Sequence, residues 1–132
     1  GAFSFKYPEK IGTTYISETD WPPTGEMLNE TFDCTPGGSD GVRAGITERK
    51  VVNGHLYCVT RVSDGAAGST YTAYAYLFPY TTEAGNKTIA IRFTLRSVQC
   101  GNYDDPKKTE CENERNTFNV DRLVDQIAGT IK

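Results

Sequence analysis

The chain has 132 residues, of which 37% are hydrophobic and 11% aromatic, and its 13 Gly and 6 Pro indicate many turns. This length and composition predict one folded domain over residues 1–132 and exclude a disordered chain. The 14 basic and 17 acidic residues give a net charge of −3, so the basic excess that nucleic-acid binding requires is missing. No run of 18 apolar residues occurs, so we expect no transmembrane helix.

The N-terminal third is predicted to hold short strands and a long loop. Residues 3–7 alternate apolar and polar side chains and stop at Pro8, which is typical of a half-buried strand. Residues 13–16 are rich in β-branched and aromatic side chains, so we expect a second strand that pairs back on the first. Proline and glycine interrupt residues 18–40, which predicts a loop with a brief edge strand at 30–32.

The middle of the chain carries the clearest turn and strand patterns. Asn53-Gly54 supplies the two left-handed residues of a type I′ turn, so residues 48–61 are predicted to form a tight hairpin. Residues 65–69 are expected to be a flexible break. Alternating strands follow over 71–78 and 89–96, and the core side of the second should consist of Ile89, Ile91, Phe93 and Leu95.

The C-terminal part is predicted to contain a loop and a helix. Residues 100–115 are polar and should form a closed surface loop. Apolar residues then recur at helical spacing between 120 and 131, and Asn119 is a suitable N-cap. The sequence therefore predicts an α+β fold, in which an antiparallel β-sheet of five to seven strands packs against one C-terminal α-helix and two disulfides hold the domain.

The four cysteines indicate an oxidising compartment. Their number is even and none lies in the C-x-x-C spacing of zinc sites or redox pairs, which favours disulfides. Four cysteines permit three connectivities, and we predict the one that closes the shortest loops, Cys34–Cys58 with Cys100–Cys111. We therefore expect an extracytoplasmic protein, either secreted or tethered to the cell envelope.

Several segments resemble a family of uncharacterised bacterial secreted and envelope-associated proteins. They are residues 96–115 followed by Thr117-Phe118, Asp20-Trp21-Pro22-Pro23, Asn53-Gly54-His55-Leu56-Tyr57-Cys58 and Gly65-Ala66-Ala67-Gly68-Ser69. This resemblance covers most of the chain and implies the compartment, but it names no catalytic residue. The opening aromatic segment that ends at Pro8, with the amphipathic segment 118–131 at the other end, is similar to the PsbP-type layout, which implies a binding or assembly module.

The polar loop between Cys100 and Cys111 is the first candidate site. Its carboxylates have the chemistry of calcium ligands, but their spacing matches no EF-hand and basic residues alternate with them. We interpret it as a solvated surface loop and expect no metal or cofactor. A disulfide-closed loop is rigid before it meets a partner, which favours recognition, although a simple structural staple is the alternative.

Trp21 is the second candidate, since an indole in a loop anchors a protein or stacks on a sugar ring unless it folds back to cap the core. The candidate binding residues are therefore Trp21, Tyr103, Asp104, Asp105, Lys107 and Lys108.

No catalytic motif is present, and the single His55 falls at a predicted hairpin tip, so we expect no enzyme. The leading hypothesis is a non-catalytic, monomeric binding or accessory domain that recognises a protein or a cell-envelope polymer. One alternative is a secreted enzyme inhibitor that presents the Cys100–Cys111 loop. The other is a small hydrolase that uses the carboxylates Asp104, Asp105 and Glu110.

Overall fold

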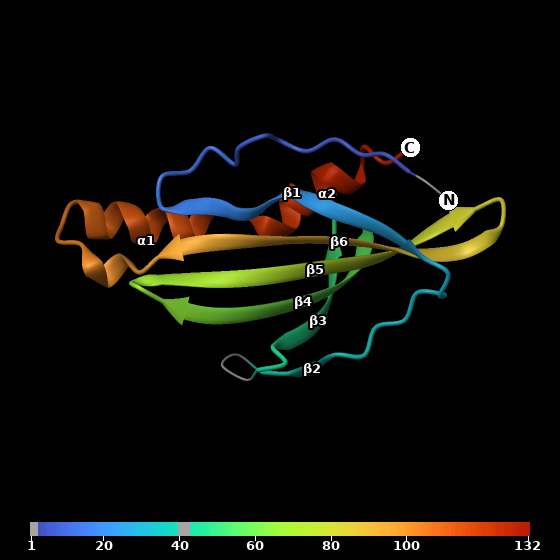
Figure 1. Cartoon of the computed structure of the whole chain (residues 1–132), viewed down its shortest axis with the longest axis horizontal. Helices are drawn as coiled ribbons and strands as arrows, with labels where there is room; N and C mark the ends of the chain where they lie inside the picture. The colour runs from blue at the N-terminus through green and yellow to red at the C-terminus, as the bar shows by residue number, and fades with distance from the viewer. Residues whose placement is uncertain (1–2, 40–42) are drawn as a thin grey trace.

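The computed structural model describes residues 3–39 and 43–132. Within these ranges six strands form one antiparallel sheet: β1 Ile16–Leu28, β2 Gly37–Gly38, β3 Ile46–Val52, β4 His55–Ala66, β5 Ser69–Thr82 and β6 Gly85–Val98. Their order across the sheet is β1-β6-β5-β4-β3-β2. A 3-10 turn η1 (Cys100–Asn102) and the helices α1 (Lys107–Thr117) and α2 (Val120–Ala128) follow the last strand (Figure 1). The predicted α+β fold class is confirmed, and the structure adds a second helix to the expected one.

Tight turns connect the strands of the meander. Asn53 and Gly54 have φ angles of 51° and 80°, so the predicted left-handed turn between β3 and β4 is confirmed. Ala67 and Gly68 have φ angles of 50° and 79° and close β4 onto β5 in the same way, where we expected only a flexible break. Because both turns are two residues long, the paired strands continue in register directly from the turn.

The hydrophobic core lies between one face of the sheet and α2. Ile89, Ile91, Phe93 and Leu95 of β6 are at most 3% exposed, as their alternation indicated. We call this side of the sheet the helix face; it also carries Tyr57 and Val59 of β4 and Tyr76 and Phe78 of β5. From α2, the side chains of Val124 and Ile127 are fully buried against it.

The prediction of a loop over residues 18–40 is wrong for its first part. β1 runs through Trp21-Pro22-Pro23 to Leu28. Its register against β6 shifts between Glu18 and Asp20 and again between Asp20 and Thr24. Proline cannot donate to a ladder, but an edge strand with irregular register accommodates it. The short strand expected at 30–32 is absent as well, because these residues have no regular structure.

The strand expected at residues 3–7 is also absent, although its burial pattern is correct. Phe3 and Phe5 pack against the core. The backbone of Ser4 exchanges two hydrogen bonds with Lys132, at 3.1 and 3.0 Å, so the start of the chain lies beside its C-terminal end (Figure 1). Residues 13–15 likewise precede β1 and do not pair with residues 3–7. Residues 3–7 are thus held at Ser4 and, through Thr130, at Lys6, without forming a strand.

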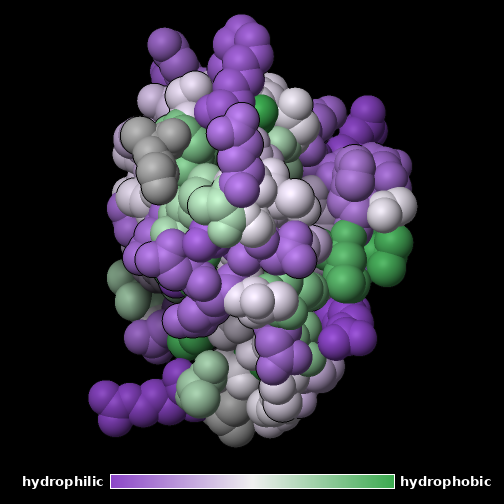
Figure 2. Space-filling model, turned by 90° about the vertical axis from the view of Figure 1, so that its right-hand side faces the viewer, coloured by the Kyte–Doolittle hydropathy of each residue, from purple (hydrophilic) through white to green (hydrophobic). Residues whose placement is uncertain are grey.

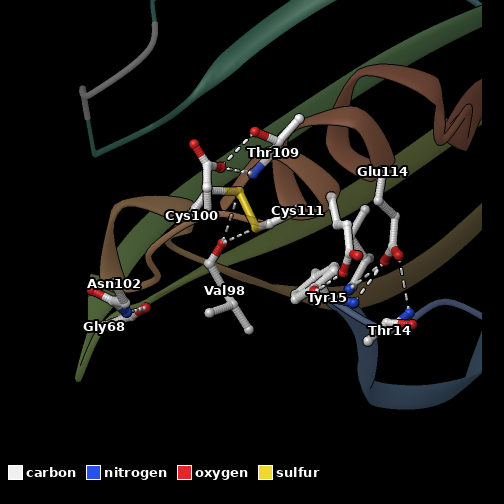
Figure 3. Close-up of a disulfide and its surroundings, with 12 residues drawn as sticks. Thr14, Tyr15, Gly68, Val98, Cys100, Asn102, Thr109, Cys111 and Glu114 are labelled. Carbon is white, nitrogen blue, oxygen red and sulfur yellow. Dashed lines mark hydrogen bonds between the residues drawn. A yellow bond between two sulfur atoms is a disulfide. The ribbon is translucent and has the colours of Figure 1, made fainter. Parts of the chain in front are cut away.

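The prediction of a closed loop over residues 100–115 is wrong, because α1 occupies most of it. The Asp105 carboxylate accepts hydrogen bonds from the backbone N–H and the hydroxyl of Thr109, at 3.0 and 2.6 Å, which supports the first turn. The carboxylate of Glu114 accepts from the N–H groups of residues 14–16 at 2.7–3.1 Å and thereby fixes α1 on the start of β1 (Figure 3). Only Cys111 of this helix is buried. The sequence therefore contains no apolar stripe from which α1 could be predicted.

Both predicted disulfides, Cys34–Cys58 and Cys100–Cys111, are confirmed. The first joins the segment after β1 to β4, and the second joins η1 to α1 (Figure 3). Two disulfides in one domain suggest an oxidising, extracellular compartment. In the part of the chain that the structure describes, no helix is long and apolar enough to cross a bilayer.

Candidate functional site

Trp21, one of the predicted binding residues, caps the core from the edge strand β1. Its ring packs edge-on against Phe93 with 5.7 Å between centroids, and its Nε1 donates to the carbonyl of Pro8 at 3.0 Å. The ring of Tyr7 meets it from the other direction at 6.3 Å. The indole is therefore held on two sides and by its only hydrogen-bond donor. It folds back on the core and does not stand out as an exposed anchor.

The other predicted binding residues gather around the start of α1. Tyr103 packs edge-on against Tyr15 at 5.6 Å, while Asp104, Lys107 and Lys108 are exposed. The pKa of Asp105 lies below its ordinary value because its carboxylate accepts the two hydrogen bonds from Thr109 described above. Asp105 thus supports the helix.

The structure does not join this group to Trp21. Among the described contacts of the indole, none reaches the Cys100–Cys111 segment. Glu110, which the hydrolase hypothesis also requires, accepts a hydrogen bond from the hydroxyl of Tyr15 at 3.1 Å. The candidate residues therefore form two separate surfaces.

A hollow outside the predicted binding residues lies between the helices and the sheet. Its volume is about 480 Å³, and the α1–α2 junction forms one side while β3, β4 and β5 form the other. We call it the interhelix cleft. It is lined by Glu48, Lys50, Val59, Arg61, Tyr74, Tyr76, Asn116, Thr117, Phe118, Asn119, Val120 and Asp121.

The sheet side of the interhelix cleft includes two aromatic residues, the partly exposed Tyr74 and the buried Tyr76. Tyr74 and Tyr76 of β5 both stack on Phe93, with centroids 5.3 and 6.2 Å apart. The hydroxyl of Tyr76 donates to Asp121 of α2 at 2.6 Å. Burial and this hydrogen bond raise the pKa of Tyr76, and burial raises that of Tyr74, so both phenols stay neutral at physiological pH.

The charged side chains of the interhelix cleft balance one another. Lys50 Nζ lies 3.2 Å from Asp121 Oδ2 and 3.8 Å from Glu48 Oε2. Arg61 Nη1 lies 3.1 Å from Glu48 Oε1. Two bases and two acids therefore alternate, and the cleft offers many donors and acceptors without a net charge. This chemistry suits a polar, uncharged ligand better than an anion or a cation.

A second cavity, of about 410 Å³, lies beside the β3–β4 turn. We call it the hairpin pocket; it is lined by Gly54, His55, Leu56, Tyr57, Phe78, Pro79, Asp125, Ala128 and Gly129. Asp125 of α2, whose side chain is 9% exposed, accepts hydrogen bonds from His55 Nδ1 at 2.8 Å, from Asn53 Nδ2 at 3.0 Å and from the Tyr57 hydroxyl. The imidazole itself is 66% exposed, as expected at a hairpin tip.

Asp125 binds its three donors as a carboxylate. Burial by itself raises the pKa of Asp125, but the hydrogen bonds from Tyr57, Asn53 and His55 outweigh it, and the net shift is downward. Folding therefore favours the charged form. Burial and the bond to Asp125 also raise the pKa of Tyr57, which remains a neutral donor.

Replacing Asp125 with asparagine should lower the free energy of unfolding by roughly 1–3 kcal/mol at pH 7, because the buried Tyr57 and the exposed Asn53 and His55 lose a charged acceptor. Since the pKa of Asp125 is depressed on folding, its stabilisation is complete above the unfolded value of about 3.9 and is lost as the pH falls through the lower folded value. Urea unfolding followed by Trp21 fluorescence should show wild type and variant converging as the pH falls below about 4. If the difference in the free energy of unfolding between wild type and variant stayed constant as the pH fell, this role of Asp125 would be contradicted.

Within residues 3–39 and 43–132, no three histidine, cysteine, aspartate or glutamate side chains are grouped so that they could hold a metal ion. Comparison of the chain with models of known protein families, with curated proteins and with solved structures finds no match. The resemblance to bacterial secreted proteins stays a prediction, and the functional argument depends on the geometry of the two cavities.

Proposed function

We propose that the chain is a non-catalytic extracytoplasmic binding domain that recognises a polymer of the cell envelope in the interhelix cleft. The observation that carries this proposal is the joint occurrence of the partly exposed ring of Tyr74 and charge-balanced polar walls in one hollow of about 480 Å³. Cavities of this size are in the range of ligand sites in proteins.

The chemistry of the interhelix cleft supports a glycan segment as the bound part of the polymer. Sugar rings present apolar C–H faces, which pack on aromatic side chains such as Tyr74, and hydroxyl groups around their rims. Asn116 and Asn119 supply amide groups from the helix side, and Arg61 and Glu48 supply charged donors and acceptors from the sheet side. A neutral ligand also avoids leaving any of these charges without a partner.

The rigidity of the interhelix cleft supports binding as well. Tyr76, Asp121 and Lys50 are linked by hydrogen bonds and an ion pair across the sheet and α2. Side chains that are ordered before the ligand arrives reduce the entropy lost on binding. The surface around Lys107 and Lys108, which the inhibitor hypothesis requires, consists of exposed side chains on the first turn of α1. It therefore offers less preformed structure.

The test is co-sedimentation with isolated, insoluble peptidoglycan at physiological salt. We expect the wild-type protein to sediment with the polymer, and Arg61→Ala to lower the affinity at least about tenfold, which corresponds to the loss of one well-placed charged contact. Arg92→Ala is the matched control, because Arg92 Nη1 also lies 3.1 Å from a glutamate oxygen, that of Glu26, but outside the cleft. The control should bind like wild type.

Four outcomes would overturn the proposal. The first is no sedimentation of the wild-type protein. The second is an equal loss in both arginine variants, which would indicate general charge attraction. The third is release of soluble sugar from the polymer, which would indicate catalysis. A loss of binding confined to Lys107→Ala/Lys108→Ala would move the site to the start of α1.

A further inference from the structure

The hairpin pocket has the form of a small-molecule site. Its side-chain lining is mostly apolar, with Leu56 and Pro79 beside the buried rings of Tyr57 and Phe78. A volume of about 410 Å³ is enough for one small ring compound. The end of the molecule seen in Figure 2 shows hydrophobic side chains in small groups between hydrophilic ones, without the broad apolar patch that the core of a protein interface needs.

The polar group of the hairpin pocket has a defined orientation. Asp125 is ionised and therefore only accepts hydrogen bonds, so His55 donates its Nδ1–H to this carboxylate. The other ring nitrogen, Nε2, makes no hydrogen bond to any residue in the described part of the chain. His55, which lines the pocket, thus keeps one ring nitrogen for a ligand.

We propose that the hairpin pocket binds a small apolar molecule that carries one hydroxyl group, of the phenol class, whose hydroxyl forms a hydrogen bond with His55 Nε2. The ring lies against Phe78 and Pro79. A carboxylic acid fits less well, because its anion would lie close to the buried charge of Asp125. This site is separate from the interhelix cleft, and no residue lines both cavities.

Gly129 gives a way to close the hairpin pocket without disturbing the fold. It follows α2 with φ −66°, an ordinary helical value, and a Cβ built there would meet only the carbonyl oxygens of Asp125 and Gln126, both at 3.5 Å. A leucine at this position is therefore compatible with the backbone and reduces the cavity. Gly101 in η1 provides the matched control, because a Cβ there meets nothing within 4 Å and Gly101 lies outside the pocket.

The experiment is an amide NMR titration of the intact domain with p-cresol and, separately, with toluene. In wild type, p-cresol should shift the signals of residues 54–56 and 125–129 and bind about two- to tenfold more tightly than toluene, as expected for one added hydrogen bond. His55→Phe, which keeps a ring but removes both ring nitrogens, should bring this ratio to about one. Gly129→Leu should abolish the shifts, and Gly101→Leu should leave them unchanged.

Each result decides for or against the site. The proposal is overturned if millimolar p-cresol shifts no signal in this region, or if His55→Phe keeps the preference for p-cresol. It is also overturned if Gly129→Leu, with an otherwise native spectrum, binds like wild type. If Gly129→Leu does not fold, the cresol-to-toluene ratio in His55→Phe still decides. None of these outcomes depends on binding in the interhelix cleft.

Discussion

Replacing Ile127 with alanine should destabilise the domain by about 2–5 kcal/mol, the usual cost of deleting a large buried aliphatic side chain. Ile127 is 1% exposed, and it and Val124 are the two residues of α2 that are fully buried against the sheet. A nine-residue helix is not stable in isolation, so its position depends on this packing. We expect a lower urea midpoint, measured by Trp21 fluorescence and circular dichroism.

Gln126→Ala is the control, because Gln126 is exposed on the same helix and its truncation should change stability by no more than about 0.5 kcal/mol. A loss below about 1 kcal/mol for Ile127→Ala would mean that the cavity collapses or that α2 is held mainly by its polar contacts. The second explanation can be tested in the Asp125→Asn background, where the two losses should add only if the contacts act independently.

The docking of α2 also determines both candidate sites. Asp121 and Asp125 are four residues apart, about one turn of the helix, and both contact the sheet, Asp121 at β3 and β5 and Asp125 at β4 and the turn before it. Asp121 binds Tyr76 and Lys50 at the interhelix cleft, whereas Asp125 binds Tyr57 at the hairpin pocket. We therefore expect Ile127→Ala to weaken ligand binding in both cavities.

Local sequence patterns were sufficient to predict the elements whose side chains repeat with a clear period. The Asn53-Gly54 turn, the buried side of β6 and the apolar stripe of α2 follow from alternation, helical spacing and turn chemistry. The disulfide pairing followed from loop length. These features depend on residues that are close in sequence, so tertiary structure did not override them.

The incorrect loop predictions for α1 and β1 have a different physical cause. α1 buries only Cys111 and is held by Asp105 and Glu114 through polar contacts, so it has no hydrophobic period. β1 contains Pro22 and Pro23, which normally argue against a strand, and an irregular edge register accommodates them. α1 is stabilised by contacts to residues distant in sequence, and β1 by an irregular pairing with β6. Neither can be recognised from the local sequence.

The candidate sites were not predictable for the same reason. Lys50 and Asp121 are 71 residues apart in sequence, and His55 and Asp125 are 70 apart. Each pair forms only when α2 packs across the strands near the β3–β4 turn. A lone histidine beside a turn and an aspartate in an amphipathic helix are common surface residues, and the sequence carries no pattern that joins them.

Removing the Cys34–Cys58 disulfide with a double alanine variant should cost about 3.4 kcal/mol, against about 2.8 kcal/mol for Cys100–Cys111, if the loop entropy of the unfolded chain dominates. The closed loops differ in length, since the cysteines are 24 and 11 residues apart. Cys34 also accepts a hydrogen bond from Arg49 through its carbonyl at 3.3 Å. The first disulfide therefore also fixes the segment after β1 against β3 and β4.

Urea unfolding of both double variants, with the wild-type protein in which both disulfides are intact as the reference, measures the two costs. If Cys100–Cys111 proves the more costly by over about 1 kcal/mol, loop entropy is not the main cause. The loss would then come from the native state, because Cys111 is the one buried side chain of α1 and its bond to Cys100 fixes this helix on η1. Adding Glu114→Gln would separate these causes, since that carboxylate holds α1 on β1 independently of the disulfide.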